Sequence, residues 1–216
     1  MSRPLLLGHR GLRLPSEPPE NTLAAFDRAL ELGCDGFEFD VRRTADGHAV
    51  ICHDPQYSSC EIAIASYEQV RHLALLEDVL ARYARRAFLD IELKVPGLEE
   101  TTLAALKHHK LQSRFVISSF FPQILQQLHS LDANVALGFL CDQDSCLAHW
   151  REFPVEYVIP HFSLVTRDLV SELHAARTKV LGWTVNHAED MSRFKDWNVD
   201  GIISDNPALL VRTVGG

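Results

Sequence analysis

The feature of this chain that most constrains its fold is a regular alternation of short apolar runs with amphipathic segments. Eight runs are predicted to be β-strands: Leu5–His9, Gly36–Thr44, Ala87–Lys94, Arg114–Phe120, Ala133–Cys141, Val155–His161, Lys179–Val185 and Val199–Asp205. Helical patterns are predicted at Asn21–Leu32, Leu75–Arg86, Leu98–Lys110, Pro122–Leu131, Ser145–Phe153, Thr166–Arg177, Ala188–Trp197 and Pro207–Val214. Eight strand–helix pairs favour a parallel sheet closed into a single (β/α)8 TIM barrel; a doubly wound open sheet is the alternative.

Residues at the helix boundaries agree with this alternation. Asn21, Ser145 and Thr166 stand where helix N-caps are expected, and Pro122 and Pro207 suit the first turn of a helix. No low-complexity linker or break in composition divides the chain. We therefore expect residues 1–216 to form one barrel domain, with one additional β-like piece, His48–Asp54, after the second strand.

The overall composition excludes several classes of protein. The formal net charge is -8, from 29 acidic and 21 basic residues, which argues against a nucleic-acid-binding domain. No stretch approaches the ~18 consecutive apolar residues of a membrane span, so stable membrane insertion is not expected. The five cysteines are odd in number and include no CxxC pair, so we expect reduced thiols and a cytoplasmic location.

Acidic residues occupy alternate positions of two predicted strands. Glu38 and Asp40 share one face of the second strand, and Glu92 and Lys94 share one face of the third, while His9 ends the first. A lone Glu-x-Asp pair more often lies on an exposed face, but here the opposite faces carry bulky apolar residues suited to contact with outer helices. The polar groups are therefore expected inside the barrel, near the C-terminal strand ends where such barrels have their active sites.

A cluster of three carboxylates requires compensation for its charge. Two carboxylates about 4 Å apart repel by roughly 4 kcal/mol at an effective dielectric of about 20. Glu38, Asp40 and Glu92 must therefore take up protons, bind a cation or recruit positive side chains, and Arg10 and Lys94 can supply part of that charge. A hard divalent cation, Mg²⁺ or Ca²⁺, matches three oxygen ligands better than Zn²⁺ does.

With the carboxylates as ligands, His9 and His53 remain for proton transfer. The unperturbed pKa of imidazole, about 6.5, suits one neutral base and one protonated acid. A metal that polarises a phosphoryl oxygen between two such groups is typical of phosphodiester cleavage. Arg10 and Lys94 could hold the anionic phosphate.

These residues fall within motifs that resemble the glycerophosphodiester phosphodiesterase family of bacterial, cytosolic type. The motifs are GHRG (Gly8–Gly11), PENTLAAF (Pro19–Phe26), GFEFDVRRTADGHAVICHDP (Gly36–Pro55), LDIELK (Leu89–Lys94), GWTVN (Gly182–Asn186) and DGIISDNP (Asp200–Pro207). Any one of them is weakly specific. Together, in this order from the first strand to the last, they are highly specific.

The resemblance implies a role for each matching residue. It implies His9 and His53 as general acid and base, Glu38, Asp40 and Glu92 as ligands of one divalent cation, and Arg10, Lys94 and Trp183 as substrate-binding residues. It also implies hydrolysis of a small glycerophosphodiester to glycerol 3-phosphate and an alcohol. In this family the glycerol 2-hydroxyl is thought to attack phosphorus first, giving a cyclic phosphate that water then opens.

Several residues around these motifs have more than one interpretation. Asn21 is expected to cap the first helix. Glu20 is expected to support the site indirectly, by contacting residues that bind the cation or the substrate. Asp205 could orient a neighbouring residue or cap the helix that begins at Pro207. His161 could face the pocket, but a structural role is at least as well supported.

The chain also departs from the family pattern. Only 38 residues separate His53 from Glu92, so the insertion after the second strand, which covers the glycerol pocket in the family, is shortened. Three alternatives stay open: a lysophospholipase D-like enzyme using an apolar loop at Ile62–Ala65, a phosphodiesterase that stops at the cyclic phosphate, and a non-catalytic barrel that binds a phosphate-bearing ligand. The sequence does not indicate the head group or the oligomeric state.

Overall fold

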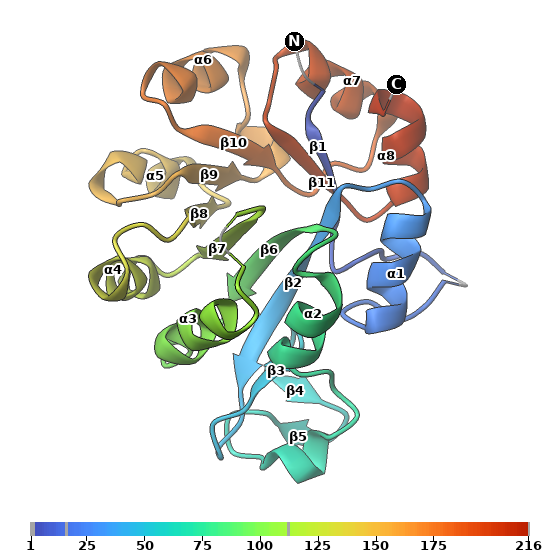
Figure 1. Cartoon of the computed structure of the whole chain (residues 1–216). Coiled ribbons are helices and arrows are strands. Elements are labelled where there is room, and N and C mark those ends of the chain that lie inside the picture. The colour runs from blue at the N-terminus through green and yellow to red at the C-terminus, as the bar shows by residue number, and fades with distance from the viewer. Residues whose placement is uncertain (1–2, 16, 112, 216) are drawn as a thin grey trace.

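Eight parallel strands close into a barrel in the computed structural model, which describes residues 3–15, 17–111 and 113–215 (Figure 1). They are β1 (Leu5–Gly8), β2 (Gly36–Arg43), β6 (Phe88–Leu93), β7 (Phe115–Ser119), β8 (Leu137–Cys141), β9 (Tyr157–Pro160), β10 (Lys179–Gly182) and β11 (Gly201–Ser204). Each strand pairs with its neighbour in chain order, and β1 pairs with both β11 and β2. The predicted (β/α)8 barrel is therefore confirmed, and the open sheet is wrong.

Helices surround the barrel on the outside (Figure 1). They are α1 (Leu23–Glu31), α2 (Leu76–Tyr83), α3 (Glu99–His108), α4 (Pro122–Leu131), α5 (Asp144–Leu147), α6 (Arg167–Ala175), α7 (Ala188–Asp196) and α8 (Pro207–Val214). Three short 3-10 helices accompany them: η1 (Tyr67–Val70), η2 (Trp150–Glu152) and η3 (Phe162–Leu164).

Alternation along the strands separates two apolar layers. Inward-facing residues such as Leu7, Phe88 and Ile203 form a small cluster inside the barrel. Outward-facing residues such as Phe37 and Phe39 join the larger layer between the strands and the helices. Because side chains two positions apart share a face of a strand, the polar side chains of β2 and β6 project inward beyond the small apolar cluster.

The shortened insertion consists of three small strands and a 3-10 helix between β2 and α2. β3 (Ala49–Ile51) pairs antiparallel with β2, and β4 (Gln56–Tyr57) forms a hairpin with β5 (Cys60–Glu61). These elements project beside β2, at the bottom of Figure 1. The predicted β-like piece His48–Asp54 is longer than the strand observed, so His53 lies in the bend that follows β3.

Two of the predicted helix starts are wrong. Thr22, not Asn21, is the N-cap of α1, because its side chain accepts a hydrogen bond from the backbone N–H of Ala25. Gln143 precedes α5, so Ser145 lies inside that helix, and the predicted segment Ser145–Phe153 divides into α5 and η2. The N-cap of Thr166 is confirmed.

Both prolines occupy the first turns of their helices, as predicted. Pro122 begins α4 and Pro207 begins α8. The N-cap of α8 is Asn206, whose side chain accepts from the N–H of Leu209. The capping alternative for Asp205 is therefore wrong.

The five cysteines are free, as expected from their number and spacing. Within the part of the chain that the structure describes, no helix combines the length and the apolar character that a membrane crossing requires.

Candidate active site

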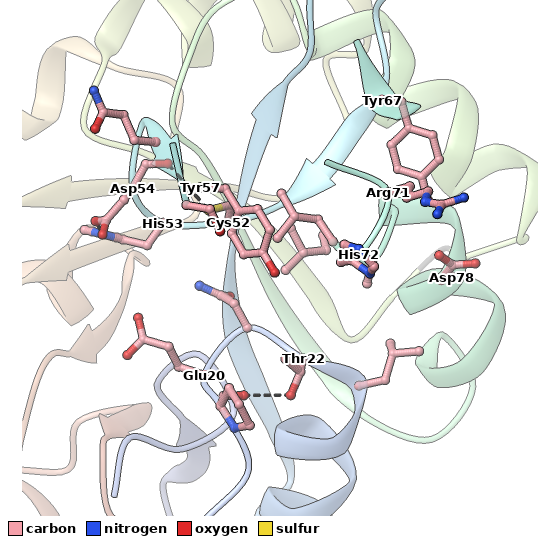
Figure 2. A pocket seen from close by; sticks show the side chains of 18 residues that line it. Glu20, Thr22, Cys52, His53, Asp54, Tyr57, Tyr67, Arg71, His72 and Asp78 are labelled. Carbon is pink, nitrogen blue, oxygen red and sulfur yellow. Dashed lines mark hydrogen bonds and ion pairs between the residues drawn. The ribbon is translucent and has the colours of Figure 1, made fainter. Parts of the chain in front are cut away.

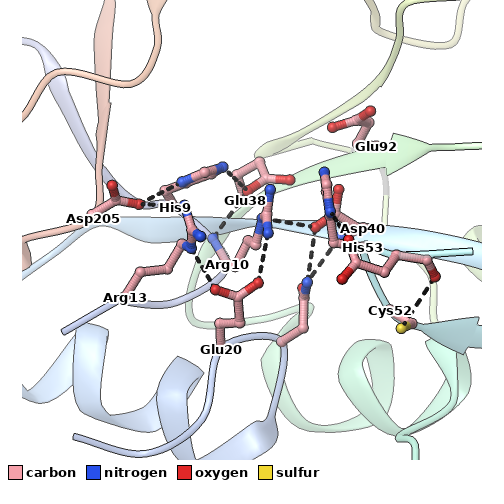
Figure 3. A network of polar contacts seen from close by, with 12 residues as sticks. His9, Arg10, Arg13, Glu20, Glu38, Asp40, Cys52, His53, Glu92 and Asp205 are labelled. Carbon is pink, nitrogen blue, oxygen red and sulfur yellow. Dashed lines mark hydrogen bonds and ion pairs between the residues drawn. The ribbon is translucent and has the colours of Figure 1, made fainter. Parts of the chain in front are cut away.

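Three buried carboxylates converge where the middle of β2 lies beside the C-terminal end of β6 (Figure 3). One oxygen each from Glu38, Asp40 and Glu92 lies within 4.8 Å of the other two. The strand register explains this convergence, because Asp40 lies beside Glu92 across the β2–β6 pair. The predicted cluster therefore forms, with all three residues turned inward and buried.

Two cations lie against the cluster. The Nζ atom of Lys94 is 2.7 Å from Oε1 of Glu92 and 3.3 Å from Oδ1 of Asp40. The Nε atom of Arg10 lies 3.2 Å from Oδ2 of Asp40, and the backbone N–H of Arg10 donates to Oε2 of Glu38 at 3.0 Å. Lys94 and Arg10 thus offset part of the negative charge.

The backbone around Arg10 is strained in a way that serves this contact. Arg10 adopts a left-handed conformation with φ 52°, which a bulky side chain rarely occupies. Gly11 follows with φ 82°, and a Cβ atom there would collide with the backbone of Ala25. The turn therefore requires glycine at position 11 and directs the N–H of Arg10 at Glu38.

The carboxylates differ in their protonation. Burial, reinforced by Asp40 and Glu92, raises the pKa of Glu38 well above its ordinary value. Burial and the charge of Asp40 raise the pKa of Glu92 to about 8, despite the nearby Lys94. Burial also favours a higher pKa for Asp40, but Lys94 and Arg10 outweigh it and lower the pKa below its usual value. Without a cation, the cluster therefore holds protons near neutral pH.

The oxygen atoms of the cluster fit a hard divalent cation. Oε1 of Glu38 and Oδ1 of Asp40 are buried and make no hydrogen bond. A buried carboxylate oxygen without a hydrogen bond is costly, and coordination to a cation would remove that cost. The donor set is entirely oxygen, which suits Mg²⁺ or Ca²⁺.

Asn21 belongs to this site rather than to a helix cap. Its side-chain amide donates to Oδ2 of Asp40 at 2.8 Å, and its oxygen accepts from the N–H of Asp40. The residue is buried and left-handed, with φ 58°, a conformation that asparagine tolerates. Asn21 therefore fixes the orientation of the Asp40 carboxylate.

His9 lies on the side of the cluster next to Glu38. Its Nε2 atom is 3.8 Å from Oε2 of Glu38, and its Nδ1 atom is 2.6 Å from Oδ1 of Asp205. The other oxygen of Asp205 accepts from the side chain of Asn186 at 2.7 Å. Asp205 and Asn186 thus hold the ring so that Nε2 faces the cluster.

His53 lies on the other side of the cluster, beside Asp40 (Figure 3), and its charge interacts with that carboxylate. Its Nδ1 atom is 2.7 Å from Oδ1 of Asp54, and its carbonyl accepts from Arg42. Burial lowers the pKa of His53 below its ordinary value, although Asp40 and Asp54 oppose that shift.

Glu20 connects two arginines at the edge of the site. Its Oε1 atom accepts from Arg10 at 2.5 Å, and its Oε2 atom is bonded to Arg13. Arg13 also lies 3.6 Å from Oδ1 of Asp205. The predicted supporting role of Glu20 agrees with these contacts. The sequence analysis missed Arg13 and Asn186, although GWTVN contains the asparagine.

Trp183 lies at the barrel mouth among other aromatic rings. Its ring is 5.4 Å from that of Phe120 and 5.6 Å from that of His161, and its Nε1–H donates to the carbonyl of Ile159. Lys94 lies 5.9 Å from the centre of the Phe120 ring. Trp183 is therefore placed on the Lys94 side of the cluster. The ring of His161 contacts Trp183, and none of the hydrogen bonds of His161 among the described residues reaches a carboxylate of the cluster.

A cavity of about 600 Å³ extends from the site under the insertion. Figure 2 shows His53 and Glu20 at one end, and Arg71 and Asp78 at the other. Tyr57 of β4 lines the space between them. Residues of the insertion therefore form one side of this cavity.

The match to a known family is direct. The family model described as "Glycerophosphoryl diester phosphodiesterase family" matches residues 9–100 and 65–209. The chain belongs to this family. That membership confirms the enzyme class expected from the motifs.

Other glycerophosphoryl diester phosphodiesterases match over nearly the whole chain. A glycerophosphodiester phosphodiesterase of Caldanaerobacter subterraneus subsp. tengcongensis is 30% identical, over 97% of both chains. One of Bacillus altitudinis is 29% identical, over 96% of both chains. These two family members are similar to the chain from end to end.

Solved structures of the family share the fold. A phosphodiesterase from Oleispira antarctica, in complex with the product sn-glycerol-3-phosphate, has a TM-score of 0.85 at 25% identity, over 99% of this chain and 98% of that one. A glycerophosphodiester phosphodiesterase from Parabacteroides distasonis also has a TM-score of 0.85, at 23% identity, over 98% of this chain and 97% of that one.

Proposed function

We propose that this chain hydrolyses glycerophosphodiesters to glycerol 3-phosphate and an alcohol, with one divalent cation and two histidines. The observation that carries the proposal is the convergence of Glu38, Asp40 and Glu92 between His9 and His53. Family membership supports the substrate class, as does the glycerol 3-phosphate bound to the Oleispira antarctica structure.

Glu38, Asp40 and Glu92 would hold the cation, which supplies Lewis-acid polarisation of a phosphoryl oxygen when bound. Arg10 and Lys94 border the same space and would bind the phosphate, because both present N–H donors beside Asp40. Asn21 would keep Asp40 oriented for both contacts. Buried hydrogen bonds of this kind hold the site in one geometry before substrate arrives.

The two histidines would divide the proton transfers. The lowered pKa of His53 favours a neutral ring at pH 7, which suits the base of the first step. The ionised Asp205 lies 2.6 Å from Nδ1 of His9 and holds the ring with Nε2 toward the cluster, and we assign His9 the role of the acid.

The first step would join the glycerol 2-hydroxyl oxygen to phosphorus and break the bond from phosphorus to the alcohol. His53 takes the proton of the hydroxyl, and His9 gives a proton to the leaving alcohol. In the second step water attacks the cyclic phosphate. His9 takes a proton from the water, His53 returns its proton to the 2-oxygen, and both rings regain their starting states.

The structure offers little support for the lysolipid alternative. Of the apolar loop singled out for it, Ile62 and Ala65 are buried, and Ile64, with 75% of its surface exposed, is the large exposed side chain. A single exposed isoleucine is ordinary for a protein surface and does not make a lipid-binding patch. No observation on the described residues favours this activity over the small-substrate reaction.

The proposal is tested by a substrate panel with both products identified. Purified protein is assayed with glycerophosphocholine, glycerophosphoethanolamine, glycerophosphoglycerol and a lysophospholipid, with Mg²⁺ and Ca²⁺ in parallel. We expect glycerol 3-phosphate and free alcohol from the soluble diesters. Turnover of the lysolipid alone would favour the lysophospholipase D-like alternative. Accumulation of a cyclic phosphate would favour the cyclising phosphodiesterase, and no turnover of any substrate would favour the binding barrel.

A further inference from the structure

Two histidines and a glutamate meet on the outer surface of the barrel, where α2 lies beside α3. Glu77 is in the first turn of α2, His108 is the last residue of α3, and His109 is its C-cap. One ligand atom from each of the three lies within 4.8 Å of the other two. We propose that Glu77, His108 and His109 form a second metal site, which binds a transition-metal cation, Zn²⁺.

The geometry requires only a small adjustment. Nε2 of His109 is 2.5 Å from Oε2 of Glu77, and the two imidazole rings lie 4.9 Å apart at 89°. A zinc ion about 2.0–2.2 Å from each ligand places tetrahedral ligand atoms roughly 3.3 Å apart. Oε2 of Glu77 must therefore move about 0.8 Å away from Nε2 of His109, which the half-exposed Glu77 side chain can do by rotation.

The ligand types distinguish this site from the barrel cluster. Two imidazoles and one carboxylate match the donor set of zinc, whereas three carboxylates match a hard cation. The C-terminal end of α3, which carries His108, also favours positive charge through the helix dipole. The two sites should therefore select different metals.

The surroundings leave room for a fourth ligand. A cavity of about 350 Å³ beside the site is lined by both histidines and by four basic residues, Arg82, Arg85, Arg86 and Lys110, but not by Glu77. Arg86, which lines the same cavity, is already bound by Asp27 at 2.7 Å. The positive charge of Arg85 and Lys110 would favour an anionic fourth ligand, such as hydroxide or chloride.

Zinc bound here would join two consecutive strand–helix units. Glu77 precedes β6, whereas His108 and His109 follow it, so the three ligands come together only when α2 and α3 take their folded positions. A cation that binds only the folded arrangement stabilises it. None of the three residues contributes to the barrel cluster, so the site acts independently of the proposed hydrolysis.

Cobalt titration tests the proposal directly. Chelator-treated full-length protein is placed in excess Mg²⁺ to occupy the barrel cluster, then titrated with Co²⁺, whose visible absorption reports ligand type and number. We expect the protein to bind one equivalent of Co²⁺, with the visible absorption bands of a four-coordinate site that contains nitrogen ligands. Added Zn²⁺ should displace this Co²⁺. We also expect Zn²⁺ to raise Tm by about 5–10 °C at 100 times its dissociation constant.

Variants locate the cation. His108→Ala and His109→Ala should each weaken Co²⁺ binding by at least about 10-fold, because loss of a ligand should cost no less than the roughly 10–100-fold that loss of a hydrogen-bond partner of a ligand costs. His108 is exposed, so its replacement should remove a ligand without disturbing the fold. The Mg²⁺-dependent turnover of His108→Ala should therefore equal that of the wild type. His149→Ala is the matched control, because His149 also contacts one glutamate, at 2.6 Å, but belongs to no group of three possible metal ligands among the described residues.

Two results would overturn the proposal. One is a wild-type protein that binds no Co²⁺ or Zn²⁺ once Mg²⁺ occupies the barrel. The other is binding that survives in His108→Ala and His109→Ala but disappears in Glu38→Gln, which would assign the Co²⁺ to the barrel cluster.

Discussion

Nδ1 of His9 lies 2.6 Å from Oδ1 of Asp205, and this contact joins the residue that follows the first strand of the barrel to the residue that follows the last. Burial would raise the pKa of Asp205, but the bond to His9 and the amide of Asn186 lower it, so the carboxylate stays ionised. An ionised carboxylate beside Nδ1 fixes the tautomer and the orientation of the ring. Asp205 is therefore a positioning residue for the proposed acid.

Replacement of Asp205 by asparagine tests that relationship. Asp205→Asn keeps the shape of the side chain but loses its charge, so turnover should fall by about 10²–10⁴-fold, the range that general acid–base catalysis contributes. Cation affinity should stay the same, because Asp205 is not a ligand. Steady-state kinetics and calorimetric titration measure the two quantities.

Asp54→Asn provides the comparison on the other histidine. The Asp54 side chain is 73% exposed, so water can replace much of its effect on His53. The loss of turnover should be no more than about 10-fold. A larger loss for Asp54→Asn than for Asp205→Asn would contradict the assigned roles.

The cluster itself predicts how cation binding depends on pH. Burial and Asp40 raise the pKa of Glu92 to about 8, so at pH 6 the cation must displace a proton from Glu92. The affinity for Mg²⁺ or Ca²⁺ should therefore rise as the pH increases from 6 to 8, by up to about tenfold per unit for one proton. Calorimetry in buffers of different ionisation heat should detect the released proton; an affinity that is constant over this range would contradict the prediction.

Asp90 predicts a separate pH dependence of stability. Its carboxyl is fully buried beneath the cluster and accepts from Ser118 at 2.6 Å, and burial raises its pKa from 3.8 to about 7. Because the folded pKa exceeds the unfolded one, its stabilising contribution is complete below pH 4 and is lost as pH rises through 7. The loss is up to about 4 kcal/mol for a shift of roughly three units.

Asp90→Asn isolates that contribution. The amide cannot ionise, so the variant should gain in Tm relative to the wild type between pH 5 and pH 8. Both proteins are compared with excess chelator, so that no bound cation changes the charge of the carboxylate cluster. A difference in Tm that is the same at both pH values would show that Asp90 does not titrate in this range.

The two arginines joined by Glu20 should differ in importance. Arg10 is buried and contacts Asp40, whereas Arg13 is substantially exposed. Arg10→Ala should lower kcat/KM by about 10²-fold or more, as expected for a preorganised donor in a buried site. Arg13→Ala should lower it by no more than about 10-fold, because exposed ion pairs contribute little. Equal losses in the two variants would assign Arg13 a direct role in binding the phosphate.

Much of the fold followed from periodicity, because strand alternation directly records which side chains face the barrel interior. The same alternation placed Glu38, Asp40 and Glu92 together, since parallel strands bring their C-terminal ends to one rim. His53 was expected near the end of the β-like piece His48–Asp54, but it lies in a bend after a three-residue strand, a detail that periodicity did not predict.

Other features depended on contacts that local sequence does not encode. Asparagine is a residue type that often caps helices, so the sequence favoured Asn21 as an N-cap. Only the fold shows that its amide binds Asp40 while the next residue caps the helix. Glu77 and His109 are 32 positions apart, so no spacing pattern indicated their contact. The bounds of α5 were also wrong, because its end at Leu147 is followed by the separate 3-10 helix η2, and the predicted segment Ser145–Phe153 ran through both.

The two histidine variants test the division of roles at the centre of the site. His9→Ala and His53→Ala should each lower turnover by at least about 10²-fold, because each removes a proton-transfer group. Each should leave the cation affinity nearly unchanged. If either variant fails to bind the cation in a calorimetric titration, that histidine is a ligand instead.

The most direct test of the central claim is the rescue of turnover by cations. Protein stripped with chelator is assayed for release of glycerol 3-phosphate, before and after excess Mg²⁺ or Ca²⁺ is added, beside Glu38→Gln treated in the same way. We predict that the stripped wild type is inactive and recovers with the cation, while Glu38→Gln stays inactive at the same concentration. Full turnover by the stripped wild type, or equal recovery by Glu38→Gln, would contradict the assignment of this cluster as the catalytic metal site.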